Sequence, residues 1–231
     1  MRRLYRTVTS RPVEGGWGVA LDGKPLRTPG KRNVVVPSAA LAAAIAAEWD
    51  VQESDIRPAT MPLTRLATTA LDRTATQHDQ IAAETANYAG TDLVCYRADH
   101  PAALAARQEA AWQPLIDWAT QRYDAPLVAT SGVVPTAQSS ESLKAFAAVV
   151  AIQDDFRLTA LQVATAACGS LIIALVLLEG RIDAAAAFAI SQLDETFQIE
   201  AWGEDTEATA RREAIAADIA AATRFAELLT A

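Results

Sequence analysis

The stretch that sets the N-terminal architecture is Trp17-Gly18-Val19-Ala20-Leu21-Asp22-Gly23-Lys24-Pro25-Leu26-Arg27-Thr28. Asp22-Gly23 is a strong two-residue hairpin signal, because both central residues of such a turn must tolerate positive φ. The residues on either side therefore form two antiparallel strands. Pro29-Gly30-Lys31 makes the next turn, and the β-branched run from Asn33 to Val36 forms a further strand that ends at Pro37. These residues predict a small antiparallel meander.

The first eleven residues allow two interpretations. They contain several arginines, Ser and Thr but no acid, a composition found in mitochondrial presequences. They also alternate as a strand does, with Leu4, Arg6 and Val8 on one face. We favour a first strand, because the glycine turn and further strands follow at once.

From Ser38 onward the apolar period becomes helical, and Ser38 is the predicted N-cap of the first helix. Pro101 opens a later helix that Pro114 should kink or split. The predicted helices span residues 38–52, 62–73, 76–89, 101–123, 139–153, 156–179, 184–202 and 205–229. The predicted fold class is α+β. A small antiparallel β-rich N-terminal domain with flanking helices (1–90) precedes a larger multi-helical C-terminal domain (91–231).

One uncharged stretch, residues 158–178, is long enough to cross a bilayer. Gln162, Gly169, several hydroxyl residues and many alanines weaken that interpretation. We therefore expect a central helix that other helices bury on all sides, and no stable membrane insertion.

The composition indicates a folded globular protein, with 51% hydrophobic and 21% charged residues. The net charge of −8 argues against nucleic-acid and anionic-membrane partners, whose phosphates would be repelled. A partner with basic patches is compatible with it. Cys95 and Cys168 each lie in an apolar run, so we expect two reduced, buried thiols.

The sequence predicts no cofactor, no metal and no catalytic residue. Residues 18–24 fit G-x-x-x-x-G-K, but Pro25 follows where a phosphate-binding loop needs Ser or Thr. His78 and His100 have no His or Cys neighbour at ligand spacing. The adjacent pair Asp154-Asp155 lies at a predicted helix boundary, which favours capping over acid–base catalysis.

The segment 193–202 is predicted to be a helix that is apolar on two opposite sides. Ile190, Leu193 and Phe197 have the spacing of a core-facing stripe. On the other side, Glu195, Ile199 and Trp202 follow the same spacing. Because a helix that only coats a core needs one apolar stripe, the second must be covered by more of this chain or by another molecule.

Tryptophans in partly exposed, acid-rimmed positions are typical anchors of protein interfaces. Trp202 fits this description, and Asp194 and Glu195 beside it would pair with Arg or Lys of a partner. The alternative is a solvated acidic helix face. Taken one by one, the other four tryptophans are more often core than interface. They are Trp17, Trp49, Trp112 and Trp118.

Several stretches resemble the assembly-chaperone family of the F-type ATP synthase, whose members bind the alpha subunit of its catalytic head. The matches are collinear and span nearly the whole chain. They are Leu21-Asp22-Gly23-Lys24-Pro25-Leu26-Arg27-Thr28-Pro29, Val36-Pro37-Ser38, Ala47-Glu48-Trp49-Asp50-Val51-Gln52, Thr60-Met61-Pro62-Leu63-Thr64, Asp92-Leu93-Val94-Cys95-Tyr96-Arg97, Leu193-Asp194-Glu195, Phe197-Gln198-Ile199 and Trp202-Gly203.

The resemblance implies a chaperone without enzymatic activity, which holds the free alpha subunit and prevents its aggregation until it pairs with beta. It implies that an acid important for function falls at Asp194 or Glu195. Trp49 matches a Trp whose loss damages function, either directly or through folding. The predicted protein-binding residues are Asp194, Glu195, Gln198, Ile199, Trp202 and Trp49. After Gly203 the chain departs from the family pattern, since Glu204-Asp205-Thr206-Glu207 contains no His.

Two other functions stay open at this stage. A carboxylate-dependent small-molecule enzyme would use a cleft between the two domains, where pockets are common. A membrane-associated factor would use residues 158–178. The alanine-rich chain without a clear presequence indicates the cytoplasm of a bacterium, whereas a eukaryotic source would place it in the mitochondrial matrix.

Overall fold

The computed structural model describes residues 2–132, 136–203 and 205–231. Two compact units make up the chain. Unit 1 comprises Met1–His78, Asp154–Ala160 and Arg224–Ala231, and unit 2 comprises Asp79–Gln153 and Leu161–Thr223. The predicted α+β class is confirmed, since a small N-terminal antiparallel sheet precedes a larger helical region. The division into folding domains at 1–90 and 91–231 stays a prediction.

The antiparallel sheet of unit 1 is organised around its second strand. Its strands are β1 (Val8–Val13), β2 (Gly16–Leu21), β3 (Lys24–Pro25) and β4 (Val35–Val36). β2 pairs with each of the other three. The predicted hairpin turn between β2 and β3 is confirmed, because Asp22 and Gly23 have φ of 48° and 78°. The strands predicted at 24–28 and 33–36 are each shortened to two residues.

The first strand begins later than predicted, at Val8. The carboxylate of Asp22 accepts hydrogen bonds from the backbone N–H of Arg6 at 3.0 Å and of Thr7 at 2.9 Å. These two N–H groups are therefore bound to the hairpin turn and not to a neighbouring strand.

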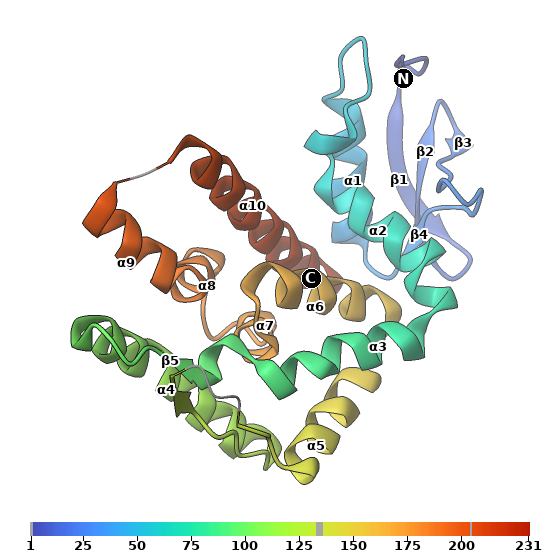
Figure 1. The fold of residues 1–231 in the computed structure, drawn as a ribbon. Helices are drawn as coiled ribbons and strands as arrows, with labels where there is room; N and C mark the ends of the chain where they lie inside the picture. The colour runs from blue at the N-terminus through green and yellow to red at the C-terminus, as the bar shows by residue number, and fades with distance from the viewer. Residues whose placement is uncertain (1, 133–135, 204) are drawn as a thin grey trace. The chain divides into compact units, whose positions relative to one another are not determined.

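Helix α1 (Ala39–Asp50) packs along β1 and β2, as Figure 1 shows. Ser38 is its N-cap as predicted, with Oγ accepting from the N–H of Leu41 at 3.0 Å. Leu41 and Ile45 are fully buried. The core of unit 1 also contains Phe225, whose ring stacks on that of Phe156 at 6.3 Å between centroids.

Glu48, near the end of α1, caps the next helix, α2 (Pro62–Asp72). Its carboxylate accepts from the N–H of Leu63 at 2.7 Å and from the N–H and hydroxyl of Thr64 at 2.8 and 2.6 Å. Free N–H groups at a helix start need acceptors, and a negative charge there also interacts favourably with the helix dipole. The stretches 47–52 and 60–64 are therefore linked physically, since one supplies the cap of the other.

We expect Glu48→Ala to lower the free energy of unfolding by about 1–3 kcal/mol, because three donors at the start of α2 lose their acceptor. Denaturant unfolding measures this. Glu48→Gln should recover part of the loss, and Glu53→Ala, an exposed acid nearby, should change stability by less than about 0.5 kcal/mol. Wild-type stability for Glu48→Ala would contradict the capping role.

Unit 2 is built mainly from helices. It contains α4 (Ala102–Tyr123), α5 (Ser140–Ala151), α7 (Leu171–Leu178), α8 (Ala184–Ser191), α9 (Leu193–Trp202) and most of α3 (His78–Ala86). Helices α6 (Asp155–Cys168) and α10 (Thr206–Leu229) have residues in both units. Two short strands, β5 (Tyr96–Arg97) and β6 (Thr130–Ser131), pair in parallel. β5 follows a 3-10 helix at Leu93–Cys95.

The single buried helix predicted at 156–179 is wrong, because the chain breaks between α6 and α7. Gly169 has a φ of 64°, and Ser170 then caps α7 by accepting from the N–H of Ile173 at 3.0 Å. The burial prediction holds best for α7, whose residues 171–177 are all buried. Among the described residues, no helix combines the length and hydropathy that a membrane span requires.

Two other helix predictions also need correction. The helix expected at 184–202 is interrupted at Gln192, which separates α8 from α9. Next to this break, the indole N–H of Trp112 donates to the carbonyl of Ile190 at 3.0 Å. Helix α4, in contrast, is not split at Pro114, and a kink at this residue stays a prediction. Its neighbours Trp112 and Ile116 are buried, so packing holds the helix together although one N–H is missing.

Glycine and aspartate mark the ends of several helices, and the prediction for the two cysteines is confirmed. Gly180 and Gly203 follow helix ends with φ of 71° and 86°, and Asp183 caps α8 by accepting from Ala186 N–H at 2.8 Å. Both cysteines are free and buried. Burial raises the pKa of each thiol to about 12, which keeps Cys95 and Cys168 protonated.

Candidate functional site

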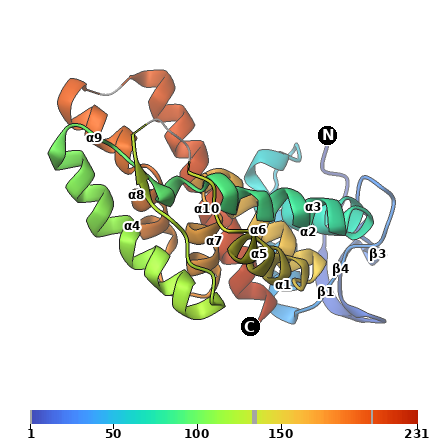
Figure 2. The same cartoon turned by 60° about the horizontal axis from the view of Figure 1, so that its bottom comes forward.

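Helix α9 carries five of the six predicted binding residues and contains no buried residue. It lies next to α4, as Figure 2 shows. Two arginines hold its inner side. Arg107 of α4 pairs with Glu200 at 2.7 Å and lies 5.1 Å from the ring centre of Phe197. Arg212 of α10 donates to the hydroxyl of Thr196 at 3.0 Å.

Asp194 also attaches the inner side of α9 to α4. Its Oδ1 accepts from Nε2 of Gln108 at 2.7 Å. Gln108 is 1% exposed, and its Oε1 accepts from the N–H of Ala98 at 2.7 Å. Asp194 therefore completes the hydrogen bonding of a buried amide in α4, which is a structural task.

The opposite side of α9 is formed by Glu195, Gln198, Ile199 and Trp202, which we call the outer face. These residues have the spacing i, i+3, i+4, i+7, so they follow one side of the helix. Within the described residues, the side chains of Glu195 and Gln198 make no hydrogen bond or ion pair. Trp202 is 82% exposed. The outer face thus combines a large apolar side chain with a carboxylate that no cation among the described residues neutralises.

The inner stripe predicted at Ile190, Leu193 and Phe197 is only half-buried. The guanidinium of Arg107 covers part of Phe197. No side chain of α9 is buried in a core. The helix is therefore attached to its neighbours only through part-exposed side chains on its inner side.

Asp194 and Glu195 should differ in their effect on stability. We expect Asp194→Ala to cost about 1–3 kcal/mol of unfolding free energy, because the buried amide of Gln108 loses its acceptor. Glu195→Ala should change stability by less than about 0.5 kcal/mol. Chemical denaturation of the two variants in parallel decides the matter, and equal losses would contradict the assignment.

Trp49, the sixth predicted residue, belongs to unit 1 and not to the unit that contains α9. It is part-exposed, and its ring lies 5.8 Å from that of Tyr5. Its carbonyl accepts from the Tyr5 hydroxyl at 2.7 Å. The indole nitrogen is buried and has no hydrogen-bond partner among the described residues.

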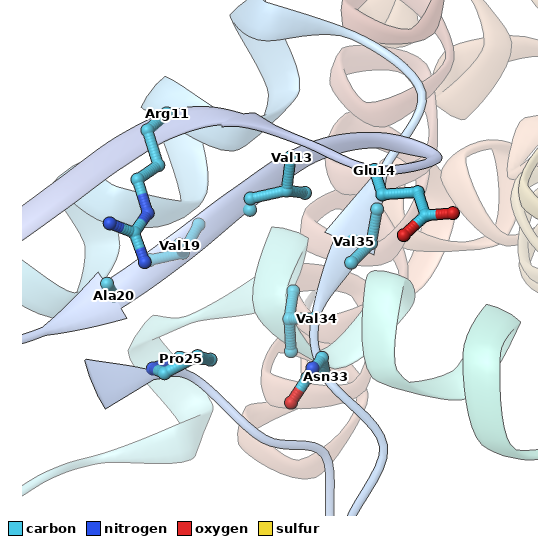
Figure 3. Close-up of a pocket in the computed structure, with 10 residues that line it drawn as sticks. Arg11, Val13, Glu14, Val19, Ala20, Pro25, Asn33, Val34 and Val35 are labelled. Carbon is cyan, nitrogen blue, oxygen red and sulfur yellow. The ribbon is translucent and has the colours of Figure 1, made fainter. Parts of the chain in front are cut away.

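Unit 1 has a shallow hollow of about 250 Å³ on its sheet. Figure 3 shows Arg11 lying near Val19 and Ala20 at one side of it, whereas Glu14 points away at the other side. Gly18 and Ala20 are the small residues of its lining. Because the two charged side chains do not converge, we assign no site to this hollow.

The carboxylates considered for catalysis have structural partners. Asp154 accepts from the N–H groups of Phe156 and Arg157 at 2.9 and 3.0 Å, which confirms its capping role. Asp155 lies 2.8 Å from Nδ1 of His78. Within the described residues, no three His, Cys, Asp or Glu side chains form a possible metal site. Glu204, part of the departure after Gly203, lies outside the described residues.

Three residues that hold α9 in place were not predicted from the sequence, namely Arg107, Gln108 and Arg212. One signal for Gln108 was available. It lies between Leu104 and Trp112 at intervals of four, so a polar residue interrupts a buried apolar stripe of α4. A buried amide in such a stripe needs partners from another element.

Comparisons with known proteins agree with this architecture. The model of a family described as ATP12 chaperone protein matches residues 2–120. A curated relative, the mitochondrial protein atp12 of Schizosaccharomyces pombe, is 22% identical over 87% of this chain and 74% of its own length.

Solved structures match over almost the whole chain. Atp12 from Paracoccus denitrificans is 46% identical, with a TM-score of 0.95 and coverage of 99% of this chain and 98% of that one. A mutant form of the same protein matches equally well over 97% of its length. The protein Atu1473 from Agrobacterium tumefaciens is 41% identical, with a TM-score of 0.94 over 99% of this chain and 86% of its own.

Proposed function

The chain belongs to the ATP12 chaperone family, and on this premise we propose that it assists assembly of the F-type ATP synthase by binding the free alpha subunit. Its role is to prevent aggregation of alpha until alpha pairs with beta. The observation that carries the choice of surface is the outer face of α9, where Trp202 is 82% exposed and Glu195 has no ion-pair partner among the described residues.

The chemistry of this surface suits a temporary cover. An unassembled subunit exposes an apolar interface and tends to aggregate. A chaperone must cover that interface and later release it to the subunit that replaces the chaperone. This exchange favours a moderate contact area with a few anchor residues. On the outer face, Trp202 would be the anchor and Ile199 its apolar neighbour.

Charge would guide the encounter. The formal charges of the two units are +3 for unit 1 and −11 for unit 2, which together give the −8 of the whole chain. An acidic unit attracts a basic surface and orients it, which affects the association rate and specificity more than the affinity. We therefore expect the alpha surface that meets α9 to be basic around an apolar centre.

Light scattering of free alpha subunit on warming tests the proposal. An equimolar amount of the chain should suppress the aggregation of alpha, and it should leave an unrelated aggregating protein unprotected. Unchanged scattering of alpha would overturn the proposed function. The compartment, bacterial cytoplasm or mitochondrial matrix according to the source, stays a prediction.

A further inference from the structure

Strand β1 lies at an edge of the sheet of unit 1, because within the described residues it pairs with β2 alone. Its residues from Thr9 to Val13 are all exposed to solvent. An edge strand presents backbone N–H and C=O groups that no neighbouring strand uses, and such groups can bind a further strand. The register of the sheet identifies these groups in β1.

The backbone groups of successive residues in an antiparallel sheet point alternately to the two sides of the strand. The carbonyl of Val19 in β2 accepts from the N–H of Leu26, just after β3, at 2.8 Å. The residues on either side of Val19 therefore bond toward β1, where their register partners are Thr9 and Arg11. The remaining residues between Val8 and Val13 turn their backbone groups to the outer side of β1. With Val8, they are Ser10 and Pro12.

A second contact gives the same alternation, since the N–H of Asp22 donates to the carbonyl of Thr7 at 2.9 Å. Five backbone groups, which we call the outer edge of β1, thus face outward. They are the N–H and C=O of Val8, the N–H and C=O of Ser10, and the C=O of Pro12. Within the described residues, none of them makes a hydrogen bond. Pro12 fits this edge, because the N–H that it lacks would point to solvent.

Pairing of this edge with the same edge of a second copy is unfavourable. With Ser10 opposite the same residue of the copy, the carbonyl of Val8 faces Pro12, which has no N–H to donate. The two Arg11 side chains would be diagonal neighbours on one face of the joined sheet, where like charges repel. Proline and charge are common devices against self-pairing of edge strands. The edge therefore suits a segment that differs from β1.

Charge specifies that segment further. Residues 2–13 contain four arginines and no acid. Arg11 is exposed, and within the described residues no carboxylate pairs with it. Figure 3 shows its side chain lying over β2 near Ala20, with Glu14 pointing away. Rotation about the side-chain bonds of this exposed arginine brings the guanidinium over a strand added on the other side of β1. Asp or Glu directly opposite is its charge complement.

We propose that the outer edge of β1 binds an extended segment of the client as an added antiparallel strand, with Asp or Glu opposite Arg11. The inference rests on the proposed function, because it assumes a polypeptide client. Main-chain hydrogen bonds supply the affinity in this mode of recognition, and the side chains beside them supply the selectivity. Unit 1 thereby gains a docking surface whose charge preference is opposite to that of the outer face of α9.

A short peptide tests the edge directly. The probe is acetyl-Val-Thr-Glu-Thr-Val-Glu-amide, whose first Glu lies opposite Arg11 when its second Thr lies opposite Ser10. Two further forms carry one backbone N-methyl group each. In one form it replaces the N–H of the second Thr, which points at β1, and in the other that of the first Glu, which points away. Methylation at Thr should weaken binding about tenfold or more, and methylation at Glu should not.

Amide signals in the NMR spectrum of the ¹⁵N-labelled full chain measure the binding and its geometry. In the free chain the N–H groups of Val8 and Ser10 should exchange with solvent much faster than those of Thr9 and Arg11, because they have no acceptor. Saturating peptide should slow the exchange of Val8 and Ser10 about tenfold or more. Replacing both Glu of the peptide by Lys should weaken binding several-fold.

Several results would overturn the proposal. Equal binding of the two methylated peptides would do so, because side chains alone would then hold the peptide. Unchanged exchange of Ser10 with bound peptide would place the peptide elsewhere. Full binding of the Lys form would remove the acidic occupant. Slow exchange of Ser10 in the free chain that is lost on dilution would assign the edge to a second copy.

Two variants at one position locate the binding in the chain. Ser10→Pro removes an outward N–H and no bond to β2, so the fold should persist. Ser10→Ala keeps the N–H and is the matched control. Ser10→Pro should abolish peptide binding, and Ser10→Ala should retain it. The pair of methylated peptides uses the wild-type chain and therefore decides the matter even if Ser10→Pro unfolds.

The failures of the two proposals are distinguishable. If the wild-type chain protects free alpha subunit and folded Ser10→Pro protects it equally well, the edge proposal fails and the proposed function stands. If Ser10→Pro needs several-fold more chaperone for the same protection and Ser10→Ala does not, the edge proposal is supported. If the wild-type chain gives alpha no protection, the proposed function fails, and the methylated peptides alone decide about the edge.

Discussion

Trp202→Ala should remove most of the protection that the chain gives to free alpha subunit, with an affinity about thirtyfold lower than that of the wild type. An exposed Trp at the centre of an interface is the residue type whose truncation costs most, about 2 kcal/mol or more. The same change should leave the thermal midpoint nearly unaltered, because a side chain that is 82% exposed contributes little to folding. Light scattering and a binding titration with alpha measure the effect.

Charge on the same helix face provides the matched test. Glu195→Lys should also weaken the protection of free alpha subunit, because the new positive charge repels a basic partner. Glu195→Gln should have a smaller effect, because it only removes the negative charge. Raising the salt concentration should reduce the difference between these two variants. Full protection by Trp202→Ala and Glu195→Lys together, in a folded chain, would exclude the outer face of α9 as the client surface.

The second large effect concerns Asp92, which is fully buried in unit 2. Its Oδ1 accepts from the N–H of Val94 at 3.2 Å, and its Oδ2 accepts from the N–H of Ile172 at 3.1 Å, at the start of α7. One carboxylate thus caps both a 3-10 helix and the most buried helix of the unit. We expect Asp92→Ala to lower the free energy of unfolding by about 3–5 kcal/mol, since buried donors are left without acceptors.

The protonation of Asp92 adds a pH dependence of known sign. Burial raises the pKa of Asp92 from 3.8 to about 6, although hydrogen bonds from Ser170 and from backbone N–H groups oppose part of this rise. Because the folded state holds the proton more tightly, the stability from this group is complete below about pH 4. It is lost as the pH rises through about 6, by up to about 3 kcal/mol.

Urea unfolding between pH 4 and pH 7 checks both statements. The stability of the wild type relative to Asp92→Asn should fall across this range, because Asn does not titrate. Asp183→Asn is a suitable control, since it alters an exposed cap of α8. A constant difference between wild type and Asp92→Asn across the range would mean that Asp92 does not titrate there.

Much of the fold follows from local signals. The turn at Asp22-Gly23 was predictable because such a turn requires positive φ at both central residues, which few residue types tolerate. The helix capped by Ser38 was predictable because its apolar residues repeat with the helical period. Boundaries were less certain where a local rule competes with packing. Pro114 should interrupt a helix, yet α4 continues through it between buried neighbours.

The candidate site was predictable only in part. The period of residues 193–202 indicated a second apolar side, and the structure leaves Trp202 on that side exposed. The spacing of the apolar residues did not indicate which of the two acids, Asp194 or Glu195, bonds to another residue of the same chain. Asp194 is bound by Gln108, which is 86 residues away in the sequence, whereas Glu195 has no such partner among the described residues.

By itself, then, the sequence determined the turns, most helix spans and the two-sided character of α9, because each depends on φ preferences or on spacing within a few residues. Only the tertiary structure decided where the long helices break and which acid of α9 is bound within the chain. The physical reason is that hydrogen-bond partners and burial are set by elements far apart in the chain. Glu48 shows this for α2, since it caps a helix that begins 14 residues after it.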